Sequence, residues 1–325
     1  MTPKHAVDVA VNIFGKPFQT SLSLLSLLDR SRQHLNKIWL NFEPFGSKFD
    51  KLQPYVIHDY LRERCDIPCE ASQPDFWLAR DTPDQERMAD PAYRSAIRYQ
   101  YAWERSSAPW LFIMHNDVYF IRDLLGAMLG QIGDAAAIAE IGQCWNCPAA
   151  NAGLAGSICA SAPCQRQHYQ EFSCTATQLR NLYREAQKSE KFSRPYDAGC
   201  IEADFSEQPW PLPECRPNEW ACLINLAKTR PITVPNGDVY PYGAFKMCGN
   251  AHLDIGVAWF RGIHRHGMAC KHINVRDYLK HWVGTGKKSA TRYAQAEDNA
   301  LAILKKRFPD YIEWLEKKAP DAMRS

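Results

Sequence analysis

The sequence predicts an α/β protein, in which helices flank a mixed sheet, and three observations support this class. Two apolar segments, residues 7–14 and 37–42, enclose a leucine-rich helical segment. A strand, a helix and a second strand in this order form a βαβ unit with a right-handed crossover. A third apolar run, Trp110 to Met114, stops abruptly at polar residues. Polar residues at the carboxyl end of a buried strand lie where α/β sheets bind ligands.

The first βαβ unit accounts for the opening of the chain. The β-branched run from Val7 to Phe14 is typical of a buried parallel strand and stops at Gly15-Lys16-Pro17. Pro17 suits the first turn of a helix, which we expect to end near Ser31. Residues 37–42 then form the second strand.

The next elements follow from start signals and apolar runs. Asp90 as a cap and Pro91 in the first turn indicate a helix that continues through Trp103. Other apolar runs predict the remaining elements in this part of the chain. They are helices over residues 55–64 and 119–129 and strands over 110–114 and 135–141.

After Gly142 the composition shifts to Cys, Gly, Pro and Ser, which predicts a loop-rich insertion up to about Cys174. Beyond it, Pro235-Asn236-Gly237-Asp238 indicates a tight hairpin turn. We expect helices over residues 219–228, 254–266 and 291–317, the last one amphipathic. The domains predicted from this pattern are 1–141, 142–175, 176–290 and the C-terminal helix 291–325.

Composition excludes several classes of protein. The 325 residues are 46% hydrophobic, so a large core is expected, and the net charge of +3 comes from intermixed acids and bases. No basic footprint for nucleic acid stands out. No apolar run approaches bilayer-spanning length, and Asp8 lies where a secretory signal needs its apolar centre. We therefore expect a cytoplasmic protein without a transmembrane segment, although peripheral membrane contact stays open.

The order of these elements resembles the GT-A glycosyltransferases of the family 2 type over roughly 130 residues. The resemblance implies a Rossmann-like half that binds a nucleoside-diphosphate sugar, a divalent cation (Mn²⁺ or Mg²⁺), and transfer of a hexose to a glycan or lipid-linked acceptor. The pieces that carry it are Val7–Phe14, Leu22–Leu28, Ile38–Glu43, Tyr93–Glu104 with Arg98, and Trp110–Asp117.

The motif His115-Asn116-Asp117 is the candidate metal edge. The family usually has Asp-X-Asp here, and His115 replaces the first acid. A hard cation held by carboxylate and phosphate oxygens stabilises the charge that gathers on a diphosphate leaving group. By resemblance Asp117 binds the metal, and His115 ligates it or donates to phosphate. The plainer interpretation is a polar strand end that caps the next helix.

The resemblance also implies nucleotide contacts. Phe14, Gly15 and Glu43 lie at the carboxyl ends of the first two strands, where base and ribose are expected, and a turn or surface role is the alternative. Asn116 belongs to the metal edge, and Arg98 is placed to reach the diphosphate unless it is a solvated surface residue.

Inverting transfer needs a base that deprotonates the acceptor hydroxyl. By resemblance this base lies about a hundred residues past the metal motif. Glu219 and Asp254 are the two candidates, and the neighbouring His252 is a possible late metal ligand. For Glu219 the alternative is a favourable charge in the first turn of a helix.

The cysteine-rich insertion is an independent signal. Cys144 and Cys147 form a tight pair, and Cys159 and Cys164 a wider one. Four thiolates suit one structural zinc, which would stabilise a loop poor in apolar residues. Reduced buried cysteines or a redox-active pair are the alternatives.

Two other functions remain open. A nucleotidyltransferase also places a nucleotide and a metal at a sheet edge, and it would release pyrophosphate instead of a nucleoside diphosphate. A non-catalytic, zinc-stabilised binding protein with a GT-A-like fold is the second alternative, because the first acid of the motif is missing.

Overall fold

The computed structural model describes residues 6–44, 50, 52–78, 81–142, 215–248, 251–281 and 290–323, together with positions 177, 181, 184, 185 and 188. The chain divides into two compact units. The first comprises Met1–Trp77, Tyr101–Gln131 and Val275–Ser325, and the second comprises Leu78–Gln100 and Ile132–Asn274. Each unit therefore combines segments that are distant in the sequence.

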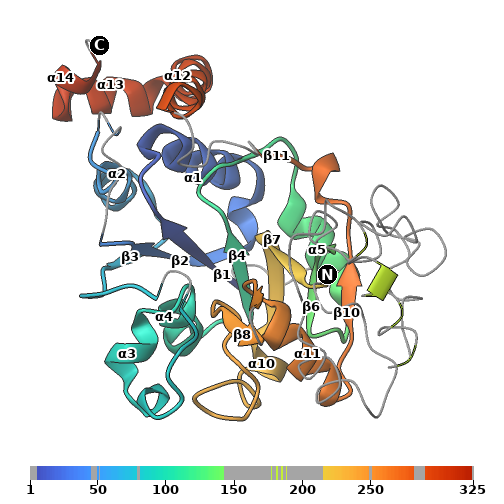
Figure 1. Cartoon of the computed structure of the whole chain (residues 1–325). Coiled ribbons are helices and arrows are strands. Elements are labelled where there is room, and N and C mark those ends of the chain that lie inside the picture. Colours follow the sequence, from blue (N-terminus) through green and yellow to red (C-terminus); the bar gives the residue numbers. More distant parts are fainter. Residues whose placement is uncertain are drawn as a thin grey trace. The chain divides into compact units, whose positions relative to one another are not determined.

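Four parallel strands form the centre of the first unit (Figure 1). Their order is β3-β2-β1-β4, so that the chain starts in the middle and moves outward in both directions. This order matches the first four strands of the doubly wound fold with strand order 3-2-1-4-5-6. Val9 pairs with Ile38 on one side and with Phe112 on the other. The strands are β1 (Val7–Ile13), β2 (Leu35–Phe42), β3 (Cys69–Ser72) and β4 (Trp110–Met114).

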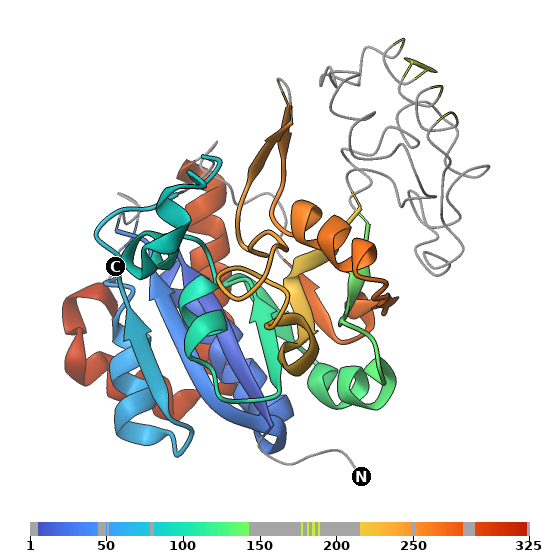
Figure 2. The same ribbon diagram turned by 90° about the horizontal axis from the view of Figure 1, so that it is seen from below.

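The first unit also contains several helices. Helix α1 begins with proline at its first turn, as predicted, and is buried on almost all sides because α12 packs against it. Figure 2 shows α4 on the side of β1 and β2 that faces away from α1. Tyr101 of α4 stacks edge-on against Trp39 of β2. The helices are α1 (Pro17–Ser31), α2 (Val56–Arg64), α4 (Gln100–Arg105), α5 (Leu124–Ile132), α12 (Ala290–Arg307), α13 (Pro309–Lys318) and α14 (Pro320–Met323).

A short two-stranded sheet lies beside α1. In it, β5 (Val118–Phe120) pairs antiparallel with β11 (Leu279–His281). Ser23 of α1 accepts a hydrogen bond from the amide of Val118 and donates one to its carbonyl, at 3.0 and 2.6 Å. The buried serines of α1 thus provide the bonds that a helix cannot offer an adjoining strand through its own backbone.

The second unit is also built on strands, but their directions are mixed. Strand β6 (Ala137–Ile141) runs parallel to β10 (Cys270–His272) and antiparallel to β7 (Pro217–Asn225). The predicted α/β class with mixed strand directions is confirmed. The remaining elements of this unit are α3 (Pro91–Ser95), α10 (Leu226–Thr229), α11 (Val257–Arg265), β8 (Lys246–Cys248), β9 (Ala251–Leu253) and the 3-10 turn Arg87–Ala89. The first unit has two further 3-10 turns, Arg32–His34 and Val275–Asp277.

Four predicted helices differ from the structure. Residues 219–228 form mainly β7, whose apolar run is buried on both faces like a central strand. The helix from Asp90 is broken where Tyr99 has a φ of 63°, and the C-terminal helix is split before Pro309. Residues 118–120 form β5, so that the helix expected from 119 starts at Leu124. Among the described residues, no helix combines the length and apolarity needed to cross a bilayer.

Candidate functional site

The candidate site of the first unit lies where two neighbouring strands end. Val11 of β1 pairs with Met114 of β4 in parallel, so the segments that follow both strands leave the sheet at the same edge. The chain turns in opposite directions after these two strands, toward β2 and away from it. Ligands of α/β sheets bind at this kind of switch point.

Three potential metal ligands meet at this edge. Asp117, His115 and His281 each offer a ligand atom, and these atoms lie within 4.8 Å of one another. Oδ1 of Asp117 is 3.2 Å from Nε2 of His281 and 3.7 Å from Nδ1 of His115. Nδ1 of His115 lies 3.4 Å from Nε2 of His281. Asp117 is buried, and both histidines are partly accessible.

His281 comes from a distant part of the sequence. It is the last residue of β11 and pairs with Val118 of β5, immediately after the motif. Sequence reasoning missed this histidine because no local pattern around residue 281 shows that β11 pairs with β5. The pairing of Leu279 with Phe120, two apolar residues, is the weak signal that existed.

Lys16 is the second residue that the sequence reasoning missed. Its ammonium lies 2.6 Å from Oδ2 of Asp117. Its backbone is left-handed, with a φ of 56°, and its amide donates to the hydroxyl of Tyr293 at 2.7 Å and to Asp50 at 3.2 Å. A lysine in this conformation persists only where the surroundings hold it, and such strain clusters at functional sites. The signal in the sequence was its place directly after the first strand.

The charges around Asp117 decide its protonation. Burial raises the pKa of this carboxyl, but Lys16 and the two histidines lower it by more than burial raises it. The pKa of Asp117 therefore lies far below its ordinary value. Burial lowers the pKa of His281, more than the attraction of Asp117 raises it. Near neutral pH the site therefore holds an ionised carboxylate and a neutral imidazole, which are the protonation states that bind metals.

These residues fit a divalent cation. Oδ1 of Asp117 faces the imidazoles, whereas Oδ2 is held by Lys16. A set of two imidazole nitrogens and one carboxylate oxygen suits Mn²⁺, Fe²⁺ or Zn²⁺ better than Mg²⁺, which prefers oxygen ligands.

Two of the residues expected to contact the nucleotide take part in building this edge. Gly15 has a φ of 59°, and its carbonyl accepts a hydrogen bond from the buried amide of Asn116 at 3.2 Å. Asn116 also donates to Thr20 at 3.0 Å. Phe14 follows β1 directly, and the amide of Glu43, after β2, donates to Ile13. The structure gives Asn116 a clear role in fixing the loop, and the nucleotide contacts remain predictions.

The other predicted residues belong to the second unit. Arg98 bridges to Gly243 through its backbone, and its guanidinium lies 5.9 Å from the ring of Phe245. His252 is in β9, opposite Met247. The metal role of His252 and the diphosphate contact of Arg98 remain predictions.

The two candidate bases are joined by one arginine. Arg216 lies 3.8 Å from Glu219 and 3.3 Å from Asp254, and all three side chains are largely buried. Glu219 lies in β7 and not in the first turn of a helix, so the helix-dipole explanation for this acid is wrong. Sequence reasoning treated the two acids as competitors, but the structure brings them into one cluster. The cysteines 144, 147, 159 and 164 lie outside the described residues.

An acid from α12 caps the first helix of the site. The carboxylate of Glu297 accepts hydrogen bonds from the amides of Phe18 and Gln19, at 2.9 and 3.1 Å, and from the side chain of Gln19 at 3.0 Å. The first amides of a helix carry positive partial charge and attract anions. The C-terminal segment of the chain therefore fixes the start of α1, next to Lys16.

The fold and site define an α/β protein with a Rossmann-like half and a candidate metal edge. No protein-family model matches the sequence, and no curated protein matches it. Among solved structures, the chain is similar to the mannosyltransferase PcManGT from Pyrobaculum calidifontis in complex with GDP-Man and Mn²⁺, with a TM-score of 0.41 and 9% identity. The similarity covers 84% of this chain and 55% of that one.

Proposed function

We propose that this protein is a metal-dependent glycosyltransferase that moves a sugar from a nucleoside-diphosphate donor to a hydroxyl of a glycan or lipid-linked acceptor. One observation carries the proposal: Asp117, His115 and His281, three potential metal ligands, lie together beside Lys16 at the switch point of the parallel strands. A carboxylate, two imidazoles and an ammonium at this place suit a cation and a diphosphate together.

Each residue has a separate task in this proposal. Oδ1 of Asp117 and the two imidazoles would hold the cation, which as a Lewis acid stabilises the charge that develops on the departing diphosphate. Lys16 is fixed by Oδ2 of Asp117 and adds a positive charge that attracts phosphate oxygens. Asn116 keeps the loop of Gly15 in place. Glu219 or Asp254 remains the predicted base.

The first test is a screen of donors. Purified protein is incubated with UDP- and GDP-sugars, with and without Mn²⁺, and the release of nucleoside diphosphate is measured, since slow donor hydrolysis needs no acceptor. We expect metal-dependent release from one donor. Pyrophosphate as the product would instead indicate a nucleotidyltransferase. Titration calorimetry that detects neither nucleotide nor Mn²⁺ binding would contradict the proposal.

The second test replaces the central acid. Asp117→Asn should lower Mn²⁺-dependent release by about 100-fold or more, because even outer partners of metal ligands contribute 10–100-fold. The change leaves the Lys16 charge without its partner, which in buried pairs costs about 3–5 kcal/mol. A double variant, Lys16→Met with Asp117→Asn, removes both charges and keeps the experiment interpretable if the single variant unfolds.

A matched control is the exposed Asp310→Asn in the first turn of α13, which should retain full activity. His281→Gln should weaken Mn²⁺ binding as Asp117→Asn does. Full Mn²⁺-dependent activity in both folded site variants would remove the proposed metal edge.

A further inference from the structure

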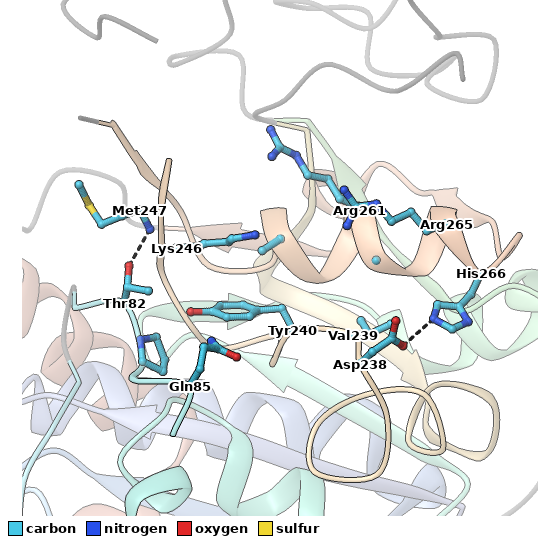
Figure 3. Close-up of a pocket in the computed structure, with 13 residues that line it drawn as sticks. Thr82, Gln85, Asp238, Val239, Tyr240, Lys246, Met247, Arg261, Arg265 and His266 are labelled. Atoms are coloured by element: carbon cyan, nitrogen blue, oxygen red, sulfur yellow. Dashed lines mark hydrogen bonds and ion pairs between the residues drawn. The ribbon is translucent and has the colours of Figure 1, made fainter. Parts of the chain in front are cut away.

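The second unit contains a cavity that the proposed reaction does not use. Its volume is about 440 Å³, and its walls come from residues 82–85, from the chain around Tyr240, from β8 and from α11. Figure 3 shows these segments around the opening, with α11 along one side and Lys246 of β8 extending toward it.

Positive charge dominates the lining. Lys246, Arg261, Arg265 and His266 contribute basic groups, and Asp238 is the one carboxylate among the described lining residues. That carboxylate is hydrogen-bonded to His266 at 2.9 Å (Figure 3). Burial of Arg261 means that its charge acts in a medium of lower dielectric than water, where it attracts anions more strongly. The balance of charges favours a ligand with more than one negative charge.

The cavity also has an apolar side. Tyr240 is held there by a hydrogen bond from its hydroxyl to the carbonyl of Phe245, at 3.1 Å, and the ammonium of Lys246 lies 5.9 Å from its ring. Met247 on the rim is 39% exposed, one of two large hydrophobic side chains that are exposed among the described residues. A ring or short chain attached to the anion finds apolar contacts at this place.

A glycine brings the two sides together. A Cβ at Gly262 would lie 2.7 Å from a methyl group of Val239, so that α11 could not approach the chain before Tyr240 as closely with any other residue. This close contact places the charged residues of α11 and the ring of Tyr240 around the same cavity. The cavity is a built feature of this unit.

We propose that this cavity binds a small phosphate monoester, with the phosphate between Lys246 and the arginines of α11 and the organic group against Tyr240 and Met247. Guanidinium groups match the geometry of phosphate oxygens and bind them in pairs. The proposal does not depend on the metal edge of the first unit.

Phenyl phosphate is the probe, and its binding is measured by titration calorimetry in EDTA, so that no divalent cation contributes. We expect binding that weakens as salt is added, and weaker binding of inorganic phosphate and of phenol. Arg265→Gln and Lys246→Gln should each weaken binding about tenfold or more, since hydrogen bonds to charged groups contribute about 1.5–3 kcal/mol. The exposed Arg62→Gln in α2 is the matched control and should bind as the wild type does.

A further variant separates the two halves of the proposal. Tyr240→Leu should weaken the binding of phenyl phosphate but leave that of inorganic phosphate unchanged. Folded Asp117→Asn protein should bind the probe normally, which distinguishes this cavity from the metal edge. The double variant Lys16→Met with Asp117→Asn replaces it if the single variant unfolds. Failure of the wild-type protein to bind phenyl phosphate, or equal binding by the folded Arg265→Gln and Lys246→Gln variants, would overturn the proposal.

Discussion

Asp117 uses its two carboxylate oxygens for different partners. Oδ2 pairs with Lys16, and Oδ1 faces the two imidazoles. A buried ion pair contributes little net stability, because desolvation offsets most of the attraction between the charges. The pair is therefore better explained by the two charged groups that it holds at the edge of the sheet, an ammonium and a carboxylate, than by stability.

Glu297 supports a prediction about pH. Burial raises the pKa of this carboxyl from 4.5 to about 7, against the lowering effect of the amides of Phe18 and Gln19. The folded protein thus keeps a proton that the unfolded chain loses above pH 4.5. The stabilisation is complete below that pH and is lost as the pH rises through 7, by about 3 kcal/mol at 1.36 kcal/mol per pKa unit.

Chemical denaturation at several pH values between 4.5 and 8 checks this prediction. As the pH rises, the unfolding free energy of the wild type should fall relative to that of Glu297→Gln. Glu313→Gln, at an exposed position of α13, serves as the control and should follow the wild type. A difference for Glu297→Gln that stays constant with pH would show that this carboxyl does not titrate in the range.

The sequence identified part of the candidate site. Asp117 and His115 were accessible to prediction because they directly follow an apolar strand. Gly15 was accessible for the same reason, at the end of β1. Lys16 was overlooked because its place in the site depends on the ion pair with Asp117, which lies 101 residues away in the sequence. His281 depends on strand pairing that no local pattern specifies.

At the scale of elements, the predictions succeeded where a periodic pattern and its end signals agreed. The boundaries of α1, with Pro17 at its start, are an example. They failed where an apolar run fits either a helix or a strand. The segment Trp220 to Ile224 is such a run, and its antiparallel pairing with β6 makes it part of β7. Local propensity was overridden by tertiary contacts in this case.

Two glycines give a matched prediction about element packing. A Cβ at Gly243 would lie 1.7 Å from the carbonyl oxygen of Arg98, a backbone atom that cannot move aside alone. Gly243→Ala should destabilise the protein by about 3 kcal/mol or more, at the upper end of typical overpacking costs. Gly130 in α5 has open space around it, so Gly130→Ala should stabilise by about 0.5–1 kcal/mol.

Denaturation midpoints of the two variants provide the measurement. Both replacements add one methyl group, so a difference in sign reports the space at each position. Equal midpoints for the two variants would mean that the chain around Arg98 and Gly243 adjusts freely.

At the scale of the whole molecule, each compact unit is assembled from separated stretches of sequence. The first unit combines residues before 78 with residues after 274. Composition and periodicity do not reveal such a division, because they describe neighbours along the chain. The predicted domain boundaries at 141, 175 and 290 remain predictions.

The predicted structural zinc can be tested on the purified protein. If the four cysteines 144, 147, 159 and 164 hold a structural zinc, elemental analysis of the purified protein should find one zinc that survives Asp117→Asn. Cys147→Ser should lose it and lower the thermal midpoint, because metal binding contributes folding free energy. Cys65→Ser, at a free and half-buried cysteine, is the control. A protein without zinc would contradict the assignment.

The pairing of β11 with β5 has a consequence for biosynthesis. The second imidazole reaches the metal edge only after residue 281 has left the ribosome and found a strand that was made about 160 residues earlier. Contacts between such distant segments form slowly, because a long loop must close first. The full set of three candidate ligands therefore exists only after β11 has paired with β5, and a nascent chain that ends before β11 has only the incomplete set of Asp117 and His115.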